Sequence, residues 1–299
     1  MRIIRFLNAN SVPVLGALTD QEEIYLLPYP GFMELVKEAE ERGVTPLKLI
    51  EDSIAGTQPV EEVLKDLKLL VPIVAPEVWA SGVTYEKSRD ARNYEATGGN
   101  AQEATCYDKV YDAERPEIFF KSTAARTIGP NDPVYLRSDS QWQIPEPELG
   151  LVLTETGKIV GYTIGNDMSC RDIEGENPLY LPQAKVWKNS CSIGPAIRLA
   201  ETVEDAYNFQ ITCRIYRDGQ LAVEGTANTA QLKRKFVELV SYLKKDNELF
   251  DGTVMLTGTC IVPPNEFTLQ DNDQIEIEIS AIGVLTNPVK VQQQARELA

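Results

Sequence analysis

The chain has 299 residues, of which 43% are hydrophobic and 25% are charged, and its formal net charge is −16 at pH 7. This length and composition are typical of a globular protein with one large domain or two smaller ones, and they show no repeat period or low-complexity tract. The negative charge repels a phosphate backbone, so nucleic acid is not an expected partner.

The sequence also bears on location in the cell and on cysteine chemistry. No apolar run approaches the roughly 20 residues that a membrane-spanning helix needs. The first residues, Met1 to Arg5, lack the long apolar region of a signal peptide. We therefore expect a cytoplasmic protein without a membrane partner. Five cysteines, an odd number without a C-x-x-C pair, argue against a disulfide framework and a zinc site.

The chain contains no histidine. This excludes serine–histidine triads, cysteine–histidine pairs and histidine-ligated zinc. Acid–base chemistry must then be carried by Glu, Asp, Lys, Tyr or Cys, whose pKa has to be shifted by burial or by charged neighbours.

Residues 1–71 are predicted to form a small α/β domain. Its expected elements are three short strands and three helices, the second of which is capped by Thr45: 2–7, 12–18, 24–27, 32–42, 45–55 and 59–70. At Val71-Pro72 the pattern changes to one of short strands. This change predicts the boundary with a second domain, residues 72–299.

The second domain is predicted to be dominated by strands. Short runs rich in Val, Ile, Thr and Tyr indicate strands at 197–200, 209–217, 221–224 and 274–279. Asp218-Gly219 predicts a hairpin turn, and apolar spacing predicts one helix over 229–244. The pattern indicates an α+β fold with a helix packed on sheet, rather than alternating strands and helices. The polar stretch 86–111 is expected to form a lid over a site.

Two glutamates, Glu146 and Glu148, stand two residues apart at the mouth of a predicted strand. Their side chains project from one face, about 7 Å apart along the backbone, and repel each other unless a cation lies between them. A hard divalent cation prefers carboxylate oxygen and needs few protein ligands, because it keeps several waters. In a chain with 45 acidic residues, a Glu-x-Glu pair also arises by chance, and this is the competing interpretation.

A third acid is brought to the same place by a predicted hairpin. Strands at 149–153 and 158–164 flank a polar loop that ends in glycine. With a loop of two or four residues, Glu146 lies opposite Gly165, and Asp167 is its diagonal neighbour on the same face. With a three-residue loop and a glycine bulge, the register shifts and Asp167 turns away.

Seven motifs, in this order, resemble signatures of the fumarylacetoacetate hydrolase family: Ser81-Gly82-Val83-Thr84-Tyr85, Phe119-Phe120-Lys121, Glu146-Pro147-Glu148, Asn166-Asp167-Met168-Ser169-Cys170-Arg171-Asp172, Lys185 before Gly194-Pro195, Asn228-Thr229 and Thr257-Gly258-Thr259. The resemblance implies a β-dominated mixed β-roll around Mg²⁺, with Mn²⁺ or Ca²⁺ as substitutes, in a homodimer or homotetramer. It implies Glu146, Glu148 and Asp167 as the metal ligands. Arg171 and Asp172 are expected to pair with each other behind the metal.

The departures from the family pattern narrow the expected reaction. Ser88 stands where the family's hydrolases and decarboxylases have a histidine that activates water. Segments 115–121, 138–142 and 176–183 resemble the branch that dehydrates 2-keto-3-deoxy pentonates of the D-arabinonate type to 2,5-dioxopentanoate. The resemblance thus implies a hydro-lyase acting on a 2-oxo sugar acid through a metal-stabilised enolate. The alternatives are a hydrolase, decarboxylase or tautomerase of an acylpyruvate or oxaloacetate, and a non-catalytic 2-oxo acid binding protein.

Glu117 and Lys185 are the candidates for proton transfer. A glutamate whose pKa is raised by burial and a lysine whose pKa is lowered by metal and desolvation can exchange protons near pH 7. Which of them is base and which is acid stays open. The competing interpretations are that Glu117 pairs with Arg115 or Lys121 at the surface and that Lys185 is solvated.

The candidate substrate-binding residues are Ser81, Lys121, Thr259 and Arg89. Ser81 stands where the longer hydrolases bring an aspartate to the metal. Arg89, together with Arg92, would meet the sugar-acid tail from the lid. In the competing interpretations, Lys121 buries its stem and bonds a carboxylate or the backbone, and Thr259 is an ordinary strand residue.

Overall fold

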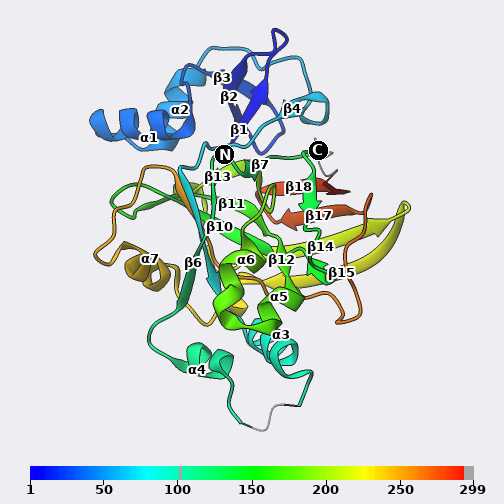
Figure 1. Ribbon diagram of the computed structural model, residues 1–299. Coiled ribbons are helices and arrows are strands. Elements are labelled where there is room, and N and C mark those ends of the chain that lie inside the picture. The colour runs from blue at the N-terminus through cyan, green and yellow to red at the C-terminus, as the bar shows by residue number, and fades with distance from the viewer. Residues whose placement is uncertain (101–102, 293–299) are drawn as a thin grey trace, which may run out of the picture.

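The computed structural model describes residues 1–100 and 103–292, and its centre is a large open sheet (Figure 1). Its main strands are, in spatial order, β3 (Ile24–Leu27), β2 (Pro13–Leu18), β1 (Arg2–Leu7), β13 (Cys191–Leu199), β11 (Ile159–Asp167), β10 (Pro147–Leu153), β16 (Thr253–Leu256), β5 (Glu77–Gly82) and β6 (Glu117–Thr123). Two short strands complete this sheet, β4 (Lys68–Leu69) on β1 and β7 (Thr127–Ile128) on β13.

A second sheet packs against one face of the first. It consists of β15 (Gln220–Asn228), β14 (Gln210–Arg217), β17 (Gln274–Ile279), β18 (Gly283–Val291) and β8 (Val134–Leu136). Leu149 and Leu151 of β10 share one apolar cluster with Ile211, Ile275 and Leu285 of the second sheet. A two-stranded sheet joins β9 (Gln143–Ile144) to β12 (Ser169–Cys170).

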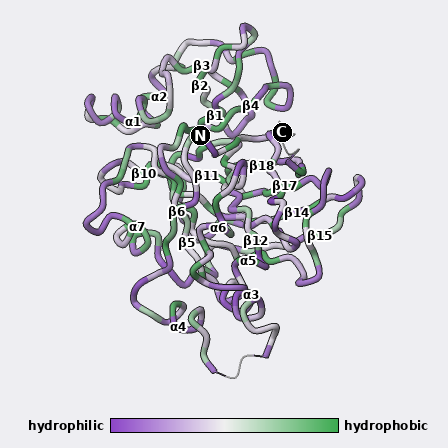
Figure 2. Tube along the Cα trace, in the orientation of Figure 1, coloured by the Kyte–Doolittle hydropathy of each residue, from purple (hydrophilic) through white to green (hydrophobic). Residues whose placement is uncertain are grey.

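Helices pack against both faces of the large sheet. They are α1 (Phe32–Glu41), α2 (Pro46–Ile54), α3 (Glu86–Thr97), α4 (Cys106–Asp112), α5 (Arg171–Glu176), α6 (Leu181–Lys185) and α7 (Phe236–Lys244). Phe32 and Leu35 of α1 pack with Val152, whereas Leu149 and Leu151 face the other core. Strand β10 is therefore buried on both faces, and Figure 2 shows hydrophobic residues along the central strands.

Most predicted elements of the first 71 residues are confirmed. The strands over 2–7 and 24–27 have the predicted bounds, and Thr45 caps α2 by accepting from the backbone N–H of Lys48. The predicted helix over 59–70 is wrong. A short 3-10 turn, Leu64–Asp66, leads instead into β4, because strand pairing with β1 overrides the amphipathic pattern.

The predicted helix over 229–244 begins later than expected. Asn228 caps a 3-10 turn, Thr229–Gln231, and α7 starts only at Phe236. Between them the backbone N–H of Lys233 donates to the carbonyl oxygen of Thr84 at 3.0 Å, so a tertiary contact replaces the first helical turns. The hairpin turn at Asp218-Gly219 is confirmed, and both residues have the positive φ that a tight hairpin requires.

The structure does not test the predicted domain boundary or the predicted lid. Strand β1 pairs with β13, so the sheet of the first 71 residues continues into the rest, and the boundary at residue 71 stays a prediction. The stretch 86–111 contains α3 and α4, with residues 101–102 outside the described ranges, and its action as a lid stays a prediction. All five cysteines are free. Within residues 1–100 and 103–292, every helix is too short or too polar to cross a bilayer.

Candidate active site

Strands β10 and β11 bring three acids together. One carboxylate oxygen each from Glu146, Glu148 and Asp167 lies within 4.8 Å of the other two, and all three side chains are buried. Glu148 lies at the start of β10 and Asp167 ends β11. The backbone N–H of Asp167 donates to the carbonyl oxygen of Glu146 at 3.0 Å, so the pairing of the two chains extends past the end of β10.

The predicted register of this hairpin is wrong by two residues. Leu153 pairs with Ile159, so the loop has an odd number of residues and shifts the register by one. That shift alone would turn Asp167 away, as expected for the loop with a glycine bulge, but a further bulge between Val152 and Leu153 shifts the register by one more, and Glu148 lies opposite Gly165. Side chains alternate with a period of two, and a two-residue shift therefore keeps Asp167 on the face of the two glutamates. The prediction that the three acids meet depended on this alternation and is confirmed.

The charges around the triad fit a divalent cation. Six acids with buried carboxylate oxygens form one cluster with four buried bases: Glu95, Glu117, Glu146, Glu148, Asp167, Glu174, Arg92, Lys121, Arg171 and Lys185. The cluster has a formal excess of two negative charges when all its members are ionised. Buried charge without a partner is costly, and one doubly charged ion with oxygen ligands would compensate this excess.

The pKa values of the triad show the same need for positive charge. Burial raises the pKa of Glu146 to about 7, against the opposing effect of Lys185. Burial and the charges of Asp167 and Glu146 raise the pKa of Glu148 well above its ordinary value. Burial acts to raise the pKa of Asp167 too, but Lys121 and Lys185 outweigh it and hold this pKa below its ordinary value. A metal ion must therefore displace protons from the glutamates.

We expect Mg²⁺ to stabilise the protein more at pH 8 than at pH 5.5. Folding raises the pKa of Glu146 from 4.5 to about 7, so the metal-free protein loses stability as the pH rises between these values. Bound Mg²⁺ favours the ionised carboxylates and restores stability above that range. Thermal unfolding with Mg²⁺ or with a chelator, at both pH values, measures this gain in Tm. An equal gain at both pH values would contradict the prediction.

Two buried lysines contact the triad from behind. Lys121 Nζ lies 2.6 Å from Asp167 Oδ1 and donates to the carbonyl oxygens of Met168, at 2.8 Å, and of Lys185. Three acceptors thus take the three protons of this ammonium group. The geometry matches the competing interpretation, in which Lys121 bonds a carboxylate and the backbone. Its contacts orient Asp167.

Lys185 contacts three carboxylates at once. Its Nζ forms an ion pair with Glu146 Oε2, and it lies 3.2 Å from Asp167 Oδ2 and 3.6 Å from Glu174 Oε1. Burial acts to lower the pKa of Lys185, as expected, but the charges of Asp167, Glu146 and Glu174 outweigh it and raise this pKa. The expected lowering is therefore absent while the acids carry no metal.

Glu117 lies beside the triad on β6, opposite Gly82 of β5. The residue is partly exposed, yet its Oε2 is buried and has no hydrogen-bond partner among the described residues. Burial raises the pKa of Glu117, with Arg92 opposing. The predicted surface pairs with Arg115 or Lys121 are not formed. Glu117 thus presents an unpaired carboxyl group at the site.

Replacing Gly82 by alanine is expected to displace Glu117. A Cβ atom at position 82 would overlap Glu117 Oε2, and the φ angle of Gly82 is open to other residues. If Glu117 transfers protons in a reaction at this site, we expect the rate of that reaction to fall at least about tenfold. In a Glu117→Gln background the same substitution should cost little more, because the two changes act on one contact. If the rate losses of Gly82→Ala and Glu117→Gln are additive in the double variant, Gly82 does not act through Glu117.

The other predicted substrate-binding residues, Ser81, Thr259 and Arg89, differ in their surroundings. Ser81 on β5 is buried, and its Oγ lacks a hydrogen-bond partner within the described ranges. Thr259 Oγ1 bonds the backbone of Ile261 at 3.2 Å. Arg89 pairs with Glu86 and Asp90 of its own helix and lies over the ring of Tyr111 of α4. Arg92, one turn later, is the arginine that points into the buried cluster.

The predicted pair of Arg171 with Asp172 is wrong. Arg171 pairs with Glu95 and, at 3.0 Å, with Glu146. Asp172 instead accepts hydrogen bonds from the 138–142 segment. Sequence reasoning missed Glu95 and Glu174. The one feature that points to Glu174 is its i, i+3 spacing from Arg171, which places both on one face of α5.

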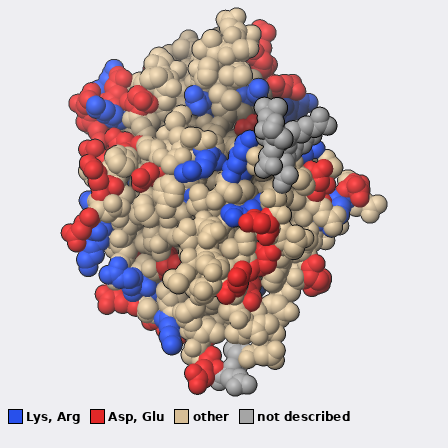
Figure 3. All heavy atoms as spheres, in the orientation of Figure 1, with Lys and Arg blue, Asp and Glu red and all other residues tan. Residues whose placement is uncertain are grey.

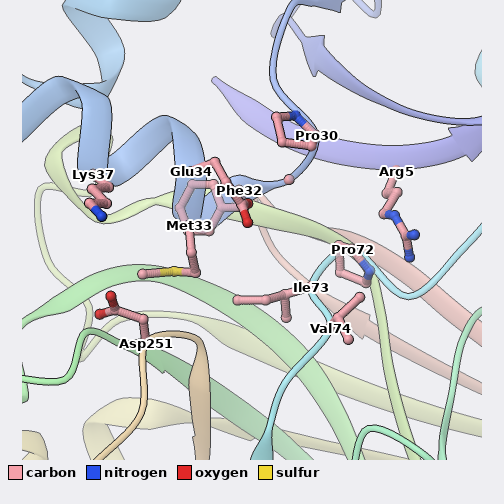
Figure 4. Close-up of a pocket in the computed structure, with 11 residues that line it drawn as sticks. Arg5, Pro30, Phe32, Met33, Glu34, Lys37, Pro72, Ile73, Val74 and Asp251 are labelled. Atoms are coloured by element: carbon pink, nitrogen blue, oxygen red, sulfur yellow. The ribbon is translucent and has the colours of Figure 1, made fainter.

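The acid triad is an interior feature. Surface acids and bases are spread over the face shown in Figure 3. A separate cavity of about 390 Å³ lies between α1 and the segment 72–74, where Arg5, Glu34 and Asp251 are among its lining residues (Figure 4). That cavity contains no member of the triad.

Comparison with known proteins identifies the family. Residues 88–290 match the family model described as Fumarylacetoacetate (FAA) hydrolase C-terminal. The chain belongs to the fumarylacetoacetate hydrolase family, as the motifs predicted. A 2-dehydro-3-deoxy-D-arabinonate dehydratase of Saccharolobus solfataricus is 47% identical over 227 residues, which are 76% of each chain. A probable 2-keto-3-deoxyxylonate dehydratase of Haloferax volcanii is 47% identical over 230 residues, 77% of this chain and 78% of that protein.

A solved structure extends the likeness to the whole fold. The structure of 2-keto-3-deoxy-D-arabinonate dehydratase complexed with magnesium and 2,5-dioxopentanoate has a TM-score of 0.81 and 37% identity to this chain. The match covers 98% of this chain and 100% of that chain. The predicted β-dominated α+β fold is thereby confirmed.

Proposed function

We propose that the protein is a Mg²⁺-dependent dehydratase of a 2-keto-3-deoxy sugar acid. It removes water from a pentonate of the 2-keto-3-deoxy-D-arabinonate type and gives 2,5-dioxopentanoate. The observation that carries the proposal is the buried triad Glu146, Glu148 and Asp167, with Lys185 and Glu117 beside it. The similarity to relatives named for this reaction supports it.

The triad would hold the metal through carboxylate oxygens. A bound Mg²⁺ supplies Lewis acidity, which draws charge from a 2-keto oxygen and makes the neighbouring C3 protons more acidic. The protein's own groups keep the acids in place. Lys121 and Lys185 contact Asp167, Arg171 contacts Glu146, and the backbone N–H of Gly258 donates to Glu148 at 2.6 Å.

Water loss requires two proton transfers, and two groups of the chain are placed for them. One group removes a C3 proton, and the other protonates the C4 hydroxyl as it leaves. Glu117 presents an unpaired carboxyl group, and Lys185 carries an ammonium group against the triad. Water loss leaves a C3=C4 double bond. Transfer of a proton from C5 back to C3 then gives the enol of the C5 aldehyde. Loss of the enol O–H proton with protonation at C4 gives 2,5-dioxopentanoate.

The chain lacks the histidine that activates water in the hydrolases of the family. Ser88 is buried on α3 at the position of the family's histidine, and a serine hydroxyl is not a base near pH 7. Hydrolysis of a C–C bond needs an activated water, whereas dehydration produces water and needs none. This difference favours a lyase over a hydrolase of an acylpyruvate.

Product analysis tests the proposal. We expect the purified protein with Mg²⁺ to convert 2-keto-3-deoxy-D-arabinonate to 2,5-dioxopentanoate, followed by proton NMR, and to leave an acylpyruvate uncleaved. Turnover of oxaloacetate or of an acylpyruvate, without turnover of the pentonate, would favour the hydrolase, decarboxylase or tautomerase alternative. If the pentonate raises the Tm but no compound reacts, the protein is a binding protein and the proposal is wrong.

We also propose a cytoplasmic homo-oligomer, either a homodimer or a homotetramer. The family resemblance supports the oligomer, and the lack of a membrane-spanning helix among the described residues is compatible with the location. Light scattering after size-exclusion chromatography measures the number of subunits. A monomer at micromolar concentration would exclude the oligomer.

A further inference from the structure

Helices α3 and α5 are joined by two crossed ion pairs. Arg92 of α3 lies 2.5 Å from Glu174 of α5, and Arg171 of α5 pairs with Glu95 of α3. The charges alternate, because each helix contributes one base and one acid. All four side chains are almost completely shielded from solvent. We call these four residues the crossed-pair cluster.

The backbone at Gly175 brings the two helices close. A Cβ atom at position 175 would lie 2.8 Å from the carbonyl oxygen of Glu95, so only glycine fits without displacing α3. The buried residues of α3 are Ser88 and Arg92, and the side chain of Glu95 is buried too; none of the three is apolar. Charged contacts therefore hold α3 in place, in contrast to α1, which buries Phe32 and Leu35.

Both residues that α5 contributes to the crossed-pair cluster, Arg171 and Glu174, also contact residues of the proposed active site. Arg171 contacts Glu146 Oε1 at 3.0 Å, and Glu174 Oε1 lies 3.6 Å from Lys185 Nζ. The other oxygen of Glu174 accepts a hydrogen bond from Ser169 Oγ at 2.9 Å. Glu174 is thus fixed by Arg92 and Ser169 and is aimed at the ammonium group of Lys185.

Metal binding changes which carboxylates are free to contact Lys185. Among the described residues, Lys185 Nζ has three carboxylate neighbours, Glu146, Asp167 and Glu174. Two of them are proposed metal ligands, whose oxygens are shared with the ion once it is bound. Glu174 is then the acid that still faces Lys185 without ligating the metal.

We propose that Glu174 is a positioning residue for Lys185, and that Arg92 acts through Glu174 by holding its carboxylate in place. The inference rests on the dehydratase function proposed above. Glu174 and Arg92 touch neither metal nor substrate in this assignment. They orient Lys185 for proton transfer after the triad has taken up its ion.

The test compares Glu174→Gln with Glu176→Gln, an exposed glutamate two residues later on α5 that serves as a matched control. We expect Glu174→Gln to lower kcat for dehydration roughly 10- to 100-fold, as changes to supporting residues of metal sites do. The KM for the pentonate should stay within about threefold of wild type, because substrate binding does not use Glu174. The rates are compared at saturating Mg²⁺, and the Mg²⁺ concentration for half-maximal Tm shift is measured as well, because the substitution removes one of the buried charges around the ion. The control should keep the wild-type kcat.

Arg92 variants give a second and independent readout. Arg92→Met should lower kcat in the same way, and Arg92→Lys should recover much of the loss because it keeps the charge. The double variant with Glu174→Gln should be no slower than Glu174→Gln alone. If Glu174→Gln does not fold, the comparison of the two Arg92 variants decides.

Three results would overturn the inference: a wild-type kcat in folded Glu174→Gln, a loss of Mg²⁺ binding that accounts for the slower rate, or an equal loss in Arg92→Met and Arg92→Lys. They leave the proposed function standing, since wild-type turnover is unaffected. A wild-type protein that does not dehydrate the pentonate removes the proposed function itself, and the inference with it.

Discussion

Replacing Glu148 by glutamine is expected to lower the dehydration rate on the order of 1000-fold while leaving the fold intact. The loss follows from removing one of three charged metal ligands in a buried site. The fold should survive because burial, Asp167 and Glu146 raise the pKa of Glu148 well above its ordinary value. Burial thus favours the neutral form of this side chain in the metal-free protein. Glutamine is also neutral and can accept the hydrogen bond from the Gly258 N–H.

Two measurements separate metal loss from unfolding in this variant. In the presence of a chelator, the Tm of Glu148→Gln should equal or exceed that of the wild type, because a raised carboxyl pKa opposes folding above pH 4.5. On addition of Mg²⁺, only the wild type should gain stability. Glu155→Gln, in the exposed hairpin loop between the same two strands, is the matched control and should behave as wild type. Full Mg²⁺-dependent turnover by Glu148→Gln would show that Glu148 is not a ligand.

The meeting of the three acids could be predicted because its geometry is local to one hairpin. Side-chain alternation alone places Glu146 and Glu148 on one face, and the hairpin turn brings Asp167 to the same edge. The odd-length loop and the bulge together made the predicted register wrong by two residues, but side chains alternate with the same period, so Asp167 stays on the face of the two glutamates. A bulge is a packing feature between strands, and the loop sequence does not show it.

The supporting charges could not be predicted, because they join elements that are distant in sequence. Arg89 and Arg92 stand three residues apart on the same polar helix, and their sequence surroundings are similar. One pairs with surface acids and the other is buried against Glu174. The difference depends on which face of α3 meets α5. On a helix with almost no apolar residues, the hydrophobic pattern does not identify the buried face.

The pKa of Lys185 shows a second limit of sequence reasoning. Lowering by desolvation was the expected effect, and burial does act in that direction. Three carboxylates within reach of one ammonium group reverse the sign, and their number is known only from the structure. If Glu146 and Asp167 bind Mg²⁺, as proposed, their effect on the proton of Lys185 would weaken. Lys185 would then exchange its proton more readily than it does in the metal-free protein.

Glu117→Gln and Lys185→Met are each expected to lower dehydration about 100-fold or more, but to differ in a simpler reaction. Pyruvate is a 2-oxo acid with C3 protons and no hydroxyl to lose, so the enzyme can only exchange those protons with solvent. The group that removes the C3 proton acts in both reactions, whereas the group that protonates the leaving hydroxyl acts only in water loss. One variant should therefore lose exchange, and the other should keep it.

Deuterium incorporation into the methyl group of pyruvate, followed by NMR in D₂O with Mg²⁺, measures the exchange. The residue whose variant stops exchange is the base, and its partner is the acid. Lys188→Met, which removes an exposed lysine three residues after Lys185, is the control and should change neither reaction. If both variants stop exchange while still binding Mg²⁺, the two roles are not divided between the residues. If both variants retain dehydration, other groups transfer the protons. Of the proposed site, only the acid triad would then keep its assigned role.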